Sequence, residues 1–266
     1  MNLVVRREGV ARVMKLVTFN PFRTIGLPGL HYIKPENMFA EKQQIEEADV
    51  CLFPENWQVN ALVYGMKKKI FPSIQSIQLG FNKIEMTRAL WSVAPELVPK
   101  TVILGRNRDT FQKVLNDFPF PFVAKEVRSS MGRGVFLIEN EKQFREYSDQ
   151  NPTYYIQEYL PIERDLRVCI VGDKAIASYW RENKNTFKNN VAQGGRIIFD
   201  DVPEEAVQVA VDTAKSLGID HAGFDLIVVD DQYYILEFNT LFGNQGFQEL
   251  NVSVEQEIAK YLGLNK

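Results

Sequence analysis

Three oxygen-bearing side chains near the end of the chain interrupt two apolar runs that flank a short polar turn. They are Asp225, Glu237 and Asn239. Side chains alternate between the two faces of a strand, so Glu237 and Asn239 share one face. A hairpin centred on Asp231 would place Asp225 opposite Glu237, about 5 Å away, whereas a register shifted by half a step would not. Hard cations such as Mg²⁺ prefer oxygen ligands of this kind, usually together with substrate phosphates, so the pattern predicts a magnesium site.

The two acids also have a plainer interpretation, as side chains on the solvent-exposed face of a hairpin. The residues that flank Asp225 and Glu237 are almost all large and apolar. A carboxylate in apolar surroundings needs a hydrogen-bonding partner or a cation. We therefore favour metal binding.

A second segment, residues 122–135, has the composition of a phosphate-binding loop. Lys125 lies on a predicted strand, and it is followed by a turn of small residues that contains Ser129, Ser130, Gly132 and Gly134. Glycines let phosphate approach the backbone, whose successive N–H groups bind anions, and a nearby lysine meets the phosphate charge. No helix beginning with Gly-Lys-Ser/Thr follows, so this is not a Walker motif. Taken alone, a hairpin turn with a solvated lysine explains the segment better.

Two weaker signals follow. An apolar strand ends at Gln157, Glu158 and Tyr159, where backbone groups could bind an adenine ring, and Asp165 could accept hydrogen bonds from ribose hydroxyls. Ordinary surface charges at a strand end are the alternative.

Residues 181–196 form an asparagine-rich run with four cations and one acid. Long loops of this kind are usually functional or disordered, so a flap over phosphates and a solvated loop remain equally good interpretations.

The periodicity predicts an α+β chain whose first part is an α/β unit. In that part we expect strands at 15–19 and 49–53 and helices at 41–48, at 59–69 and from Asn82. Pro95 and Pro99 mark a linker. Beyond it we expect helices capped by Asp109 and Asn140, helices at 204–217 and 252–262, and strands at 101–104, 122–127, 135–139, 154–159, 166–171 and 174–180. Antiparallel hairpins mixed with helices are typical of α+β folds. The predicted domains are residues 1–95 and 96–266, the second with subdomains of about 96–158 and 159–266.

Composition sets limits on the function. The chain is 45% hydrophobic and 24% charged, as in an ordinary globular protein, and its net charge of −3 does not indicate binding to nucleic acid or to anionic membranes. Cys51 and Cys169 lie within apolar runs, which indicates buried thiols without a disulfide framework. No signal peptide or transmembrane helix is apparent, so we expect a cytoplasmic location.

In their order along the chain, these motifs resemble the ATP-grasp superfamily, and most closely its RimK-like branch of ribosomal S6 glutamate ligases and amino-acid ligases. The resemblance spans residue 82 to the C-terminus. Its elements are Lys83 on a helix, Lys125 with its Ser/Gly loop, the strand end at 157–159, Asn190 before paired glycines, and the Asp225…Glu237-x-Asn239 hairpin. The ordered set is fairly specific, and the hairpin carries most of it.

The resemblance implies roles for these residues. The ATP-binding residues would be Lys83, Lys125, Ser129, Ser130, Gly132, Gly134, Gln157, Glu158, Tyr159 and Asp165. The catalytic residues would be Arg181, Lys125 and Asn190. The ligands of two Mg²⁺ ions, with Mn²⁺ as the alternative, would be Asp225, Glu237 and Asn239.

The resemblance also implies an ATP-dependent carboxylate–amine ligase that forms an amide or peptide bond through an acyl phosphate. Its partners would be a carboxylate substrate and an amine on an amino acid, a peptide or a protein tail, without nucleic acid or membrane. A homo-oligomer stays open, since relatives often form dimers or tetramers. A small-molecule kinase on the same scaffold and a non-catalytic nucleotide-binding module are the alternatives.

Overall fold

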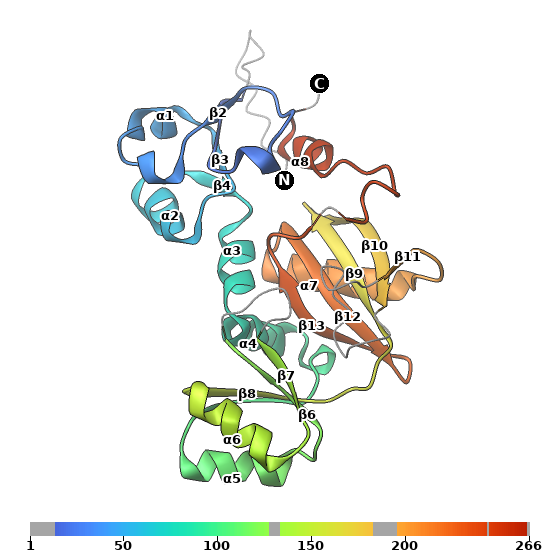
Figure 1. The fold of residues 1–266 in the computed structure, drawn as a ribbon. Helices are drawn as coiled ribbons and strands as arrows, with labels where there is room; N and C mark the ends of the chain where they lie inside the picture. The colour runs from blue at the N-terminus through green and yellow to red at the C-terminus, as the bar shows by residue number, and fades with distance from the viewer. Residues whose placement is uncertain (1–13, 128–133, 183–195, 244, 265–266) are drawn as a thin grey trace. The chain divides into compact units, whose positions relative to one another are not determined.

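The computed structural model describes residues 14–127, 134–182, 196–243 and 245–264 (Figure 1). Contacts within the chain form two compact units, one of residues 1–71 and 255–266 and the other of residues 72–254. The boundary predicted at residue 95 lies inside the second unit. The reason is that helix α4 (Lys83–Val93) contributes Met86 and Leu90 to the core of that unit.

The first unit is a parallel sheet with helices, as expected for an α/β unit. Its strand order is β2-β1-β3-β4, and every pair is parallel. The strands are β1 (Leu16–Thr18), β2 (Leu30–Tyr32), β3 (Val50–Leu52) and β4 (Lys69–Phe71). The helices are α1 (Lys42–Glu47), α2 (Asn56–Asn60) and α8 (Val254–Leu262). Parallel neighbours need crossover connections, which short helices and turns supply here.

The helix predicted at residues 59–69 is wrong in its second half. α2 ends at Asn60, a single π-helical segment (Ala61–Gly65) follows, and Lys69 already begins β4. Lys67 adopts a φ of 55°, in the left-handed region, which ends the helical run. β2 and β4 were also not predicted. β2 is largely exposed and so has no apolar run, whereas Lys69, the first residue of β4, falls within the predicted helix.

The smaller sheet of the second unit has the strand order β5-β8-β6-β7, with all pairs antiparallel. The strands are β5 (Thr101–Gly105), β6 (Phe122–Lys125), β7 (Val135–Ile138) and β8 (Thr153–Glu158), and the helices are α5 (Arg108–Asp117) and α6 (Glu141–Gln150). Phe122 and Ile156 point toward the helices and meet Phe118 and Phe144 in one apolar core. Because strands alternate, Lys125 and Gln157 lie on the opposite face.

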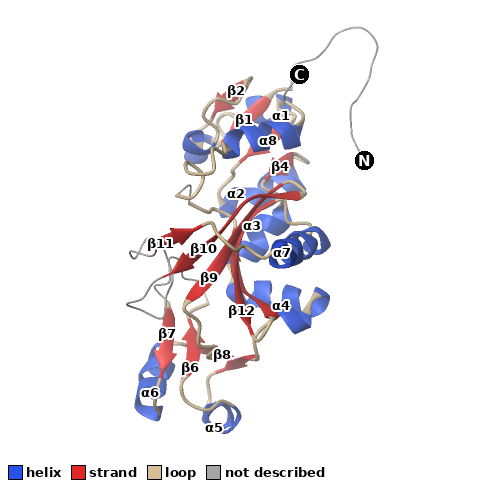
Figure 2. Ribbon diagram, turned by 90° about the vertical axis from the view of Figure 1, so that its right-hand side faces the viewer, coloured by secondary structure: helices blue, strands red, loops and turns tan. Residues whose placement is uncertain are grey.

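The larger sheet has the order β11-β10-β9-β12-β13, also antiparallel throughout. Its strands are β9 (Arg164–Val171), β10 (Lys174–Glu182), β11 (Arg196–Ile198), β12 (His221–Val229) and β13 (Gln232–Asn239). One face packs on α4 and α7 (Glu204–Leu217), and Figure 2 shows α7 alongside these strands. Leu166, Phe224 and Phe238 are fully buried in that core. The residues beside them in sequence point to the other face, where the candidate site lies.

Asparagine side chains begin three helices of the second unit. Asn82 accepts a hydrogen bond from the Ile84 amide at the start of α4, and Asn140 caps α6, both as predicted. α5 is capped by Asn107, which accepts from the Thr110 amide, and not by Asp109. Asn and Asp are both good capping residues, so the sequence alone does not choose between them.

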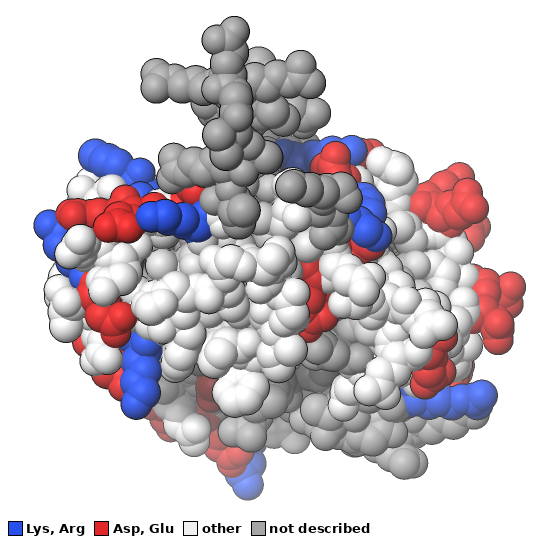
Figure 3. Space-filling view, turned by 90° about the horizontal axis from the view of Figure 1, so that it is seen from above, with Lys and Arg blue, Asp and Glu red and all other residues white. Residues whose placement is uncertain are grey.

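The charged side chains of the described surface are mixed in sign. Figure 3 shows lysines and arginines interspersed with aspartates and glutamates on the face that it views. Among the described helices, none combines the length and the apolar character that crossing a membrane requires. The sign pattern fits the small net charge of the whole chain, −3.

A partly buried polar network ties α3 (Ile74–Phe81) to the start of β12. Asp220 accepts hydrogen bonds from the Ser73 amide at 2.7 Å and from the Ser76 hydroxyl at 3.1 Å, both through Oδ1. Burial raises the pKa of the Asp220 carboxyl above its ordinary value, although these hydrogen bonds oppose the shift. α3 was not predicted, although Ser73 is a capping signal in front of it.

Replacing Asp220 tests this network. We expect Asp220→Ala to lower the free energy of unfolding by about 1–3 kcal/mol, because two partly buried donors lose their acceptor. Asp220→Asn keeps an acceptor oxygen and should cost less. Urea denaturation of the two variants measures the difference.

Wild type and Asp220→Asn should also differ in how their stability depends on pH. A carboxyl with a raised folded pKa binds its proton more tightly in the folded than in the unfolded state, so wild-type stability falls as pH rises through the carboxyl range. The Asn variant lacks this contribution. Wild type should therefore lose stability relative to Asp220→Asn between acidic and neutral pH, and a parallel pair of stability curves would contradict the assignment.

Candidate active site

The hairpin of β12 and β13 brings the predicted metal ligands to one end of one face. Asp225 pairs with Glu237 across the strands, and Gly223 pairs with Asn239. The side chains of Glu237 and Asn239 are in contact, since the Asn239 amide donates to Glu237 Oε1 at 3.1 Å. The pairing that the sequence predicts is therefore confirmed.

The register reaches this pairing through a β-bulge. The turn residues Asp230 and Asp231 have φ values of 50° and 61°, the left-handed conformation that two-residue hairpin turns require. From the turn to Leu226, which pairs with Ile235, the register is centred between these two aspartates. One extra residue on β13, Leu236, then shifts the pairing by half a step and sets Asp225 opposite Glu237.

Asp225 lies within a buried cluster of four charges. Arg167 Nε lies 2.6 Å from Asp225 Oδ1, and Arg167 Nη2 donates to Oδ2 at 3.1 Å. Arg181 Nη2 lies 2.9 Å from Asp225 Oδ1, and Arg181 Nε donates to Asp165 at 2.6 Å. All four side chains are less than a tenth exposed. Charges buried this deeply are tolerated when each has a partner of opposite sign, as here.

Strand pairing assembles this cluster. Asp225 sits opposite Arg167 on β9, and Asp165 sits opposite Arg181 on β10. Gly223 leaves room for the arginine: a Cβ at that position would lie 2.6 Å from Arg167 Nη1. Although burial lowers it, the pKa of Arg181 is raised overall by Asp225 and Asp165. Burial raises the pKa of Asp165 to about 6 against the opposing effect of Arg181.

Two buried lysines approach the hairpin from other elements. Lys83, at the first turn of α4, places Nζ 3.8 Å from Glu237 Oε2. Lys125, at the end of β6, donates to the carbonyl of the bulge residue Leu236 at 3.5 Å and lies over the ring of Tyr155. Burial lowers the pKa of Lys125 to about 8; Glu237 opposes the shift and Lys83 adds to it. The structure thus brings one predicted phosphate-binding lysine to Glu237 and the other to its sequence neighbour Leu236.

The strand end predicted to hold adenine has its side chains engaged elsewhere. Gln157 donates to the Thr101 hydroxyl at 2.9 Å, and the Glu158 carboxylate accepts from the Lys100 amide at 2.6 Å. Tyr159 follows β8 outside any strand. The side chains of Gln157 and Glu158 therefore anchor β8 to the start of β5, which leaves backbone groups for the predicted contact.

Two further predicted residues, Asp165 and Gly134, make contacts within the fold, and four others lie outside the described residues. Asp165 is turned toward Arg181 in the charge cluster. Gly134 precedes β7, and its carbonyl accepts from the Glu126 amide at 2.7 Å. Ser129, Ser130, Gly132 and Asn190 lie outside the described residues.

Arg167 belongs to the site, although the sequence patterns predicted no role for it. The alternation along β9 puts it on the same face as Asp165, which is a readable signal once that strand is recognised. Its partner Asp225 lies 58 residues away, so only the strand order reveals the ion pair.

Residues 83–262 match the model of the RimK-like ATP-grasp domain. The chain belongs to the RimK-like ATP-grasp family. The match begins at Lys83 and includes the charge cluster and the β12–β13 hairpin.

Two relatives are named as glutamate ligases. The chain is 31% identical over 145 residues to the tetrahydromethanopterin:α-L-glutamate ligase of Methanocaldococcus jannaschii, covering 49% of this chain and 50% of that protein. It is 25% identical over 217 residues to the coenzyme γ-F420-2:α-L-glutamate ligase of the same organism, covering 78% of this chain and 74% of that protein. The chain thus spans about half the length of the first of these relatives.

Solved structures share the fold. A RimK-domain ATP-grasp protein of Sphaerobacter thermophilus superimposes with a TM-score of 0.69 at 14% identity, covering 93% of this chain and 98% of that one. The D-alanine–D-alanine ligase of Bacillus anthracis complexed with ATP gives 0.69 at 12% identity, covering 94% and 97%. The predicted α+β, ATP-grasp fold is therefore confirmed.

Removing a single charge from the cluster should lower the stability strongly, whereas removing one charge of each sign should lower it less. We expect Arg167→Met to lower the free energy of unfolding by about 3–5 kcal/mol, because it leaves the buried cluster one negative charge in excess. Adding Asp225→Asn leaves the Asp165–Arg181 pair and restores neutrality. The double variant should then be more stable than Arg167→Met, as measured by denaturant unfolding. Additive losses in this double-mutant cycle would contradict the coupling.

Proposed function

We propose that the protein is an ATP-dependent carboxylate–amine ligase that forms an amide or peptide bond through an acyl phosphate. The observation that carries this proposal is the convergence of Lys83 and Asn239 on Glu237, opposite Asp225, with Lys125 at the neighbouring Leu236 carbonyl. Cations and oxygen ligands around one point suit a transferring phosphoryl group, where catalysis consists mainly of positioning and charge stabilisation. The names of the related ligases support the same reaction class.

The donors suit Mg²⁺ if substrate phosphates complete its coordination. Within the described part of the chain, no group of three or more His, Cys, Asp and Glu side chains is arranged so that it could hold a metal ion by itself. Asp225, Glu237 and Asn239 nevertheless supply two carboxylates and an amide oxygen on one face. Mg²⁺ is commonly held by one or two carboxylates plus phosphate oxygens. We propose that these residues hold two Mg²⁺ ions, which would neutralise phosphate charge, with Mn²⁺ as the alternative.

The chain's own side chains would position ATP and neutralise its charge. Lys83 and Lys125 are held at the edge of the hairpin, and backbone groups near Glu158 and Tyr159 would bind adenine. Arg181 already bridges Asp165 and Asp225, so its guanidinium is oriented before substrate binds. A preoriented cation stabilises developing negative charge without the cost of reorganisation.

L-Glutamate is our proposed candidate for one of the two substrates, because both M. jannaschii relatives are α-L-glutamate ligases. The amine that forms the new bond would belong to an amino acid, a peptide or a protein tail. The cytoplasmic location and a homo-oligomeric state stay predictions.

Product analysis separates the proposal from its alternatives. Purified protein is incubated with Mg²⁺-ATP, L-glutamate and a panel of acids and amines, and products are identified by mass spectrometry. A ligase releases ADP only when both acid and amine are present and yields an amide. A stable phosphorylated product would instead identify a kinase, and ATP binding without turnover over the whole panel would identify a binding module.

A variant of Glu237 tests the site itself. We expect Glu237→Gln to weaken Mn²⁺ binding, measured by electron paramagnetic resonance, by about 10–100-fold and to reduce ADP release by at least as much. The matched control is Glu96→Gln, an exposed acid outside the site, which should leave both unchanged. Unaltered metal binding and turnover in Glu237→Gln would refute the assignment.

A further inference from the structure

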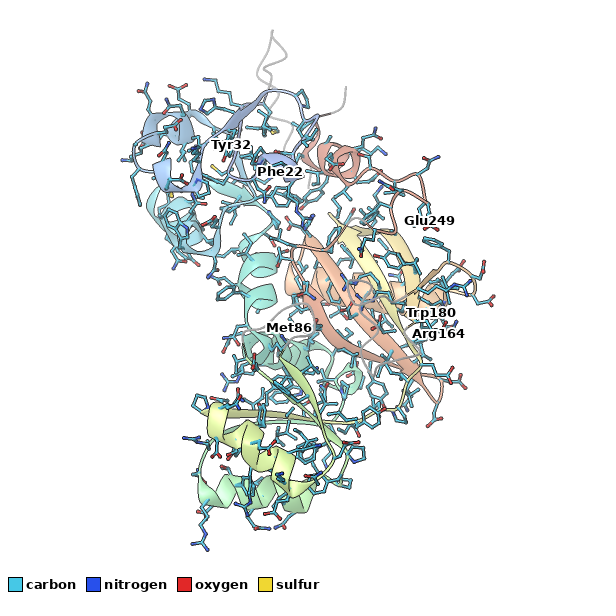
Figure 4. The ribbon with its side chains drawn as sticks, in the orientation of Figure 1. Phe22, Tyr32, Met86, Arg164, Trp180 and Glu249 are labelled. Carbon is cyan, nitrogen blue, oxygen red and sulfur yellow. The ribbon has the colours of Figure 1, made fainter. Side chains whose placement is uncertain are left out.

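A cavity of about 530 Å³ lies on the reverse side of the larger sheet. It is formed by the loop before β9, the paired ends of β9 and β10, the segment before α7, and Val228 of β12. Figure 4 shows Arg164 and Trp180, two of its lining residues, beside each other. The volume falls within the range of small-molecule sites, about 300–1,000 Å³.

The sheet itself separates this cavity from the candidate active site. Arg164 pairs with Glu182 across β9 and β10, and both line the cavity. Their sequence neighbours Asp165 and Arg181 belong to the charge cluster on the other face. Successive side chains point to opposite faces of a strand, so the cavity is not part of the ATP site.

The cavity wall already shows one cation bound to an aromatic ring. The guanidinium carbon of Arg164 lies 4.1 Å from the centroid of the Trp180 ring. Trp180 is buried, and its indole N–H donates to the Asp201 carbonyl at 3.2 Å, which fixes the ring. Asp201 has a φ of 54°, a conformation that costs energy in a residue other than glycine. Arg164, in contrast, is an exposed side chain that can move away.

The charges around this pair are predominantly negative. Three acidic residues line the cavity, Glu163, Glu182 and Asp201, against one basic residue, Arg164. Within the part of the chain that the structure describes, none of these carboxylates forms an ion pair. Pro203 and Val228 supply apolar wall. An aromatic ring, several carboxylates and apolar surface together suit a cation on a hydrocarbon stem.

We propose that this cavity is a second ligand site, which binds a small organic cation of the alkylguanidine or alkylamine class. The cationic head replaces the Arg164 guanidinium on Trp180, and the carboxylates of Glu182 and Asp201 compensate its charge. The hydrocarbon stem lies against Val228. Arg164 acts as an internal competitor for this position, so its removal should strengthen binding.

Titration calorimetry with agmatine, at low ionic strength and with the full chain, tests the proposal. Agmatine carries a guanidinium and an ammonium on a short alkyl stem. We expect saturable binding at one site. The double variant Glu182→Gln/Asp201→Asn should weaken binding by about fivefold or more, because it removes two neutralising charges. Arg164→Ala should tighten binding by about two- to fivefold, because it frees the ring face.

The controls distinguish this site from unspecific attraction to acids. Glu36→Gln removes an exposed acid far along the chain and should not change the affinity. 4-Guanidinobutyrate, with a carboxylate in place of the amine, should bind more weakly than agmatine. The proposal is overturned if agmatine shows no saturable binding up to about 10 mM. It is equally overturned if Arg164→Ala weakens binding, or if Glu36→Gln has the same effect as the double variant.

Discussion

The ion pairs around Asp225 are the constraint on which the second unit depends. A buried carboxylate with two guanidinium partners fixes which strands are neighbours, because Arg167 comes from β9 and Arg181 from β10. Slippage of β12 by one residue would turn Asp225 into the apolar core beside α7, where it would have no partner. The register of the sheet is therefore determined by electrostatics on one face and by apolar packing on the other.

Both sheets of the second unit divide their faces in this way. The smaller sheet buries Phe122 and Ile156 under its helices and presents Lys125 on the opposite face. The larger sheet buries Phe224 and Phe238 and presents Asp225 and Glu237. Lys125 reaches across to the carbonyl of Leu236, the extra residue of the bulge. An irregularity in one strand thus provides the contact point for a cation carried by the other sheet.

The sequence was informative where the signal was local. The symmetry of Asp225 and Glu237 about the turn, the capping asparagines at 82 and 140, and the strand at residues 166–171 could all be read from neighbouring residues. The bulge at Leu236 could not, since one extra residue in an apolar run leaves the composition unchanged. The prediction of the Asp225–Glu237 pair was right although the hairpin turn is centred half a step away.

Long-range choices of partner were beyond the reach of sequence patterns. Asp165 was predicted as a ribose ligand from its position near a strand end. Its ion pair with Arg181 arises from the β9–β10 pairing, which the residues next to Asp165 in the sequence do not reveal. The short helix α3 was missed for a similar reason, because its polar start is stabilised by Asp220, 144 residues away from Ser76.

Gly223 limits which substitutions this protein can accept. A Cβ at that position would come within 2.6 Å of Arg167 Nη1 and 3.0 Å of Phe242. Alanine at 223 and the present placement of Arg167 are therefore mutually exclusive. Sequence drift at the two positions has to be coordinated, and homologues with a side chain at 223 should show a smaller residue or a different ion-pairing scheme at 167.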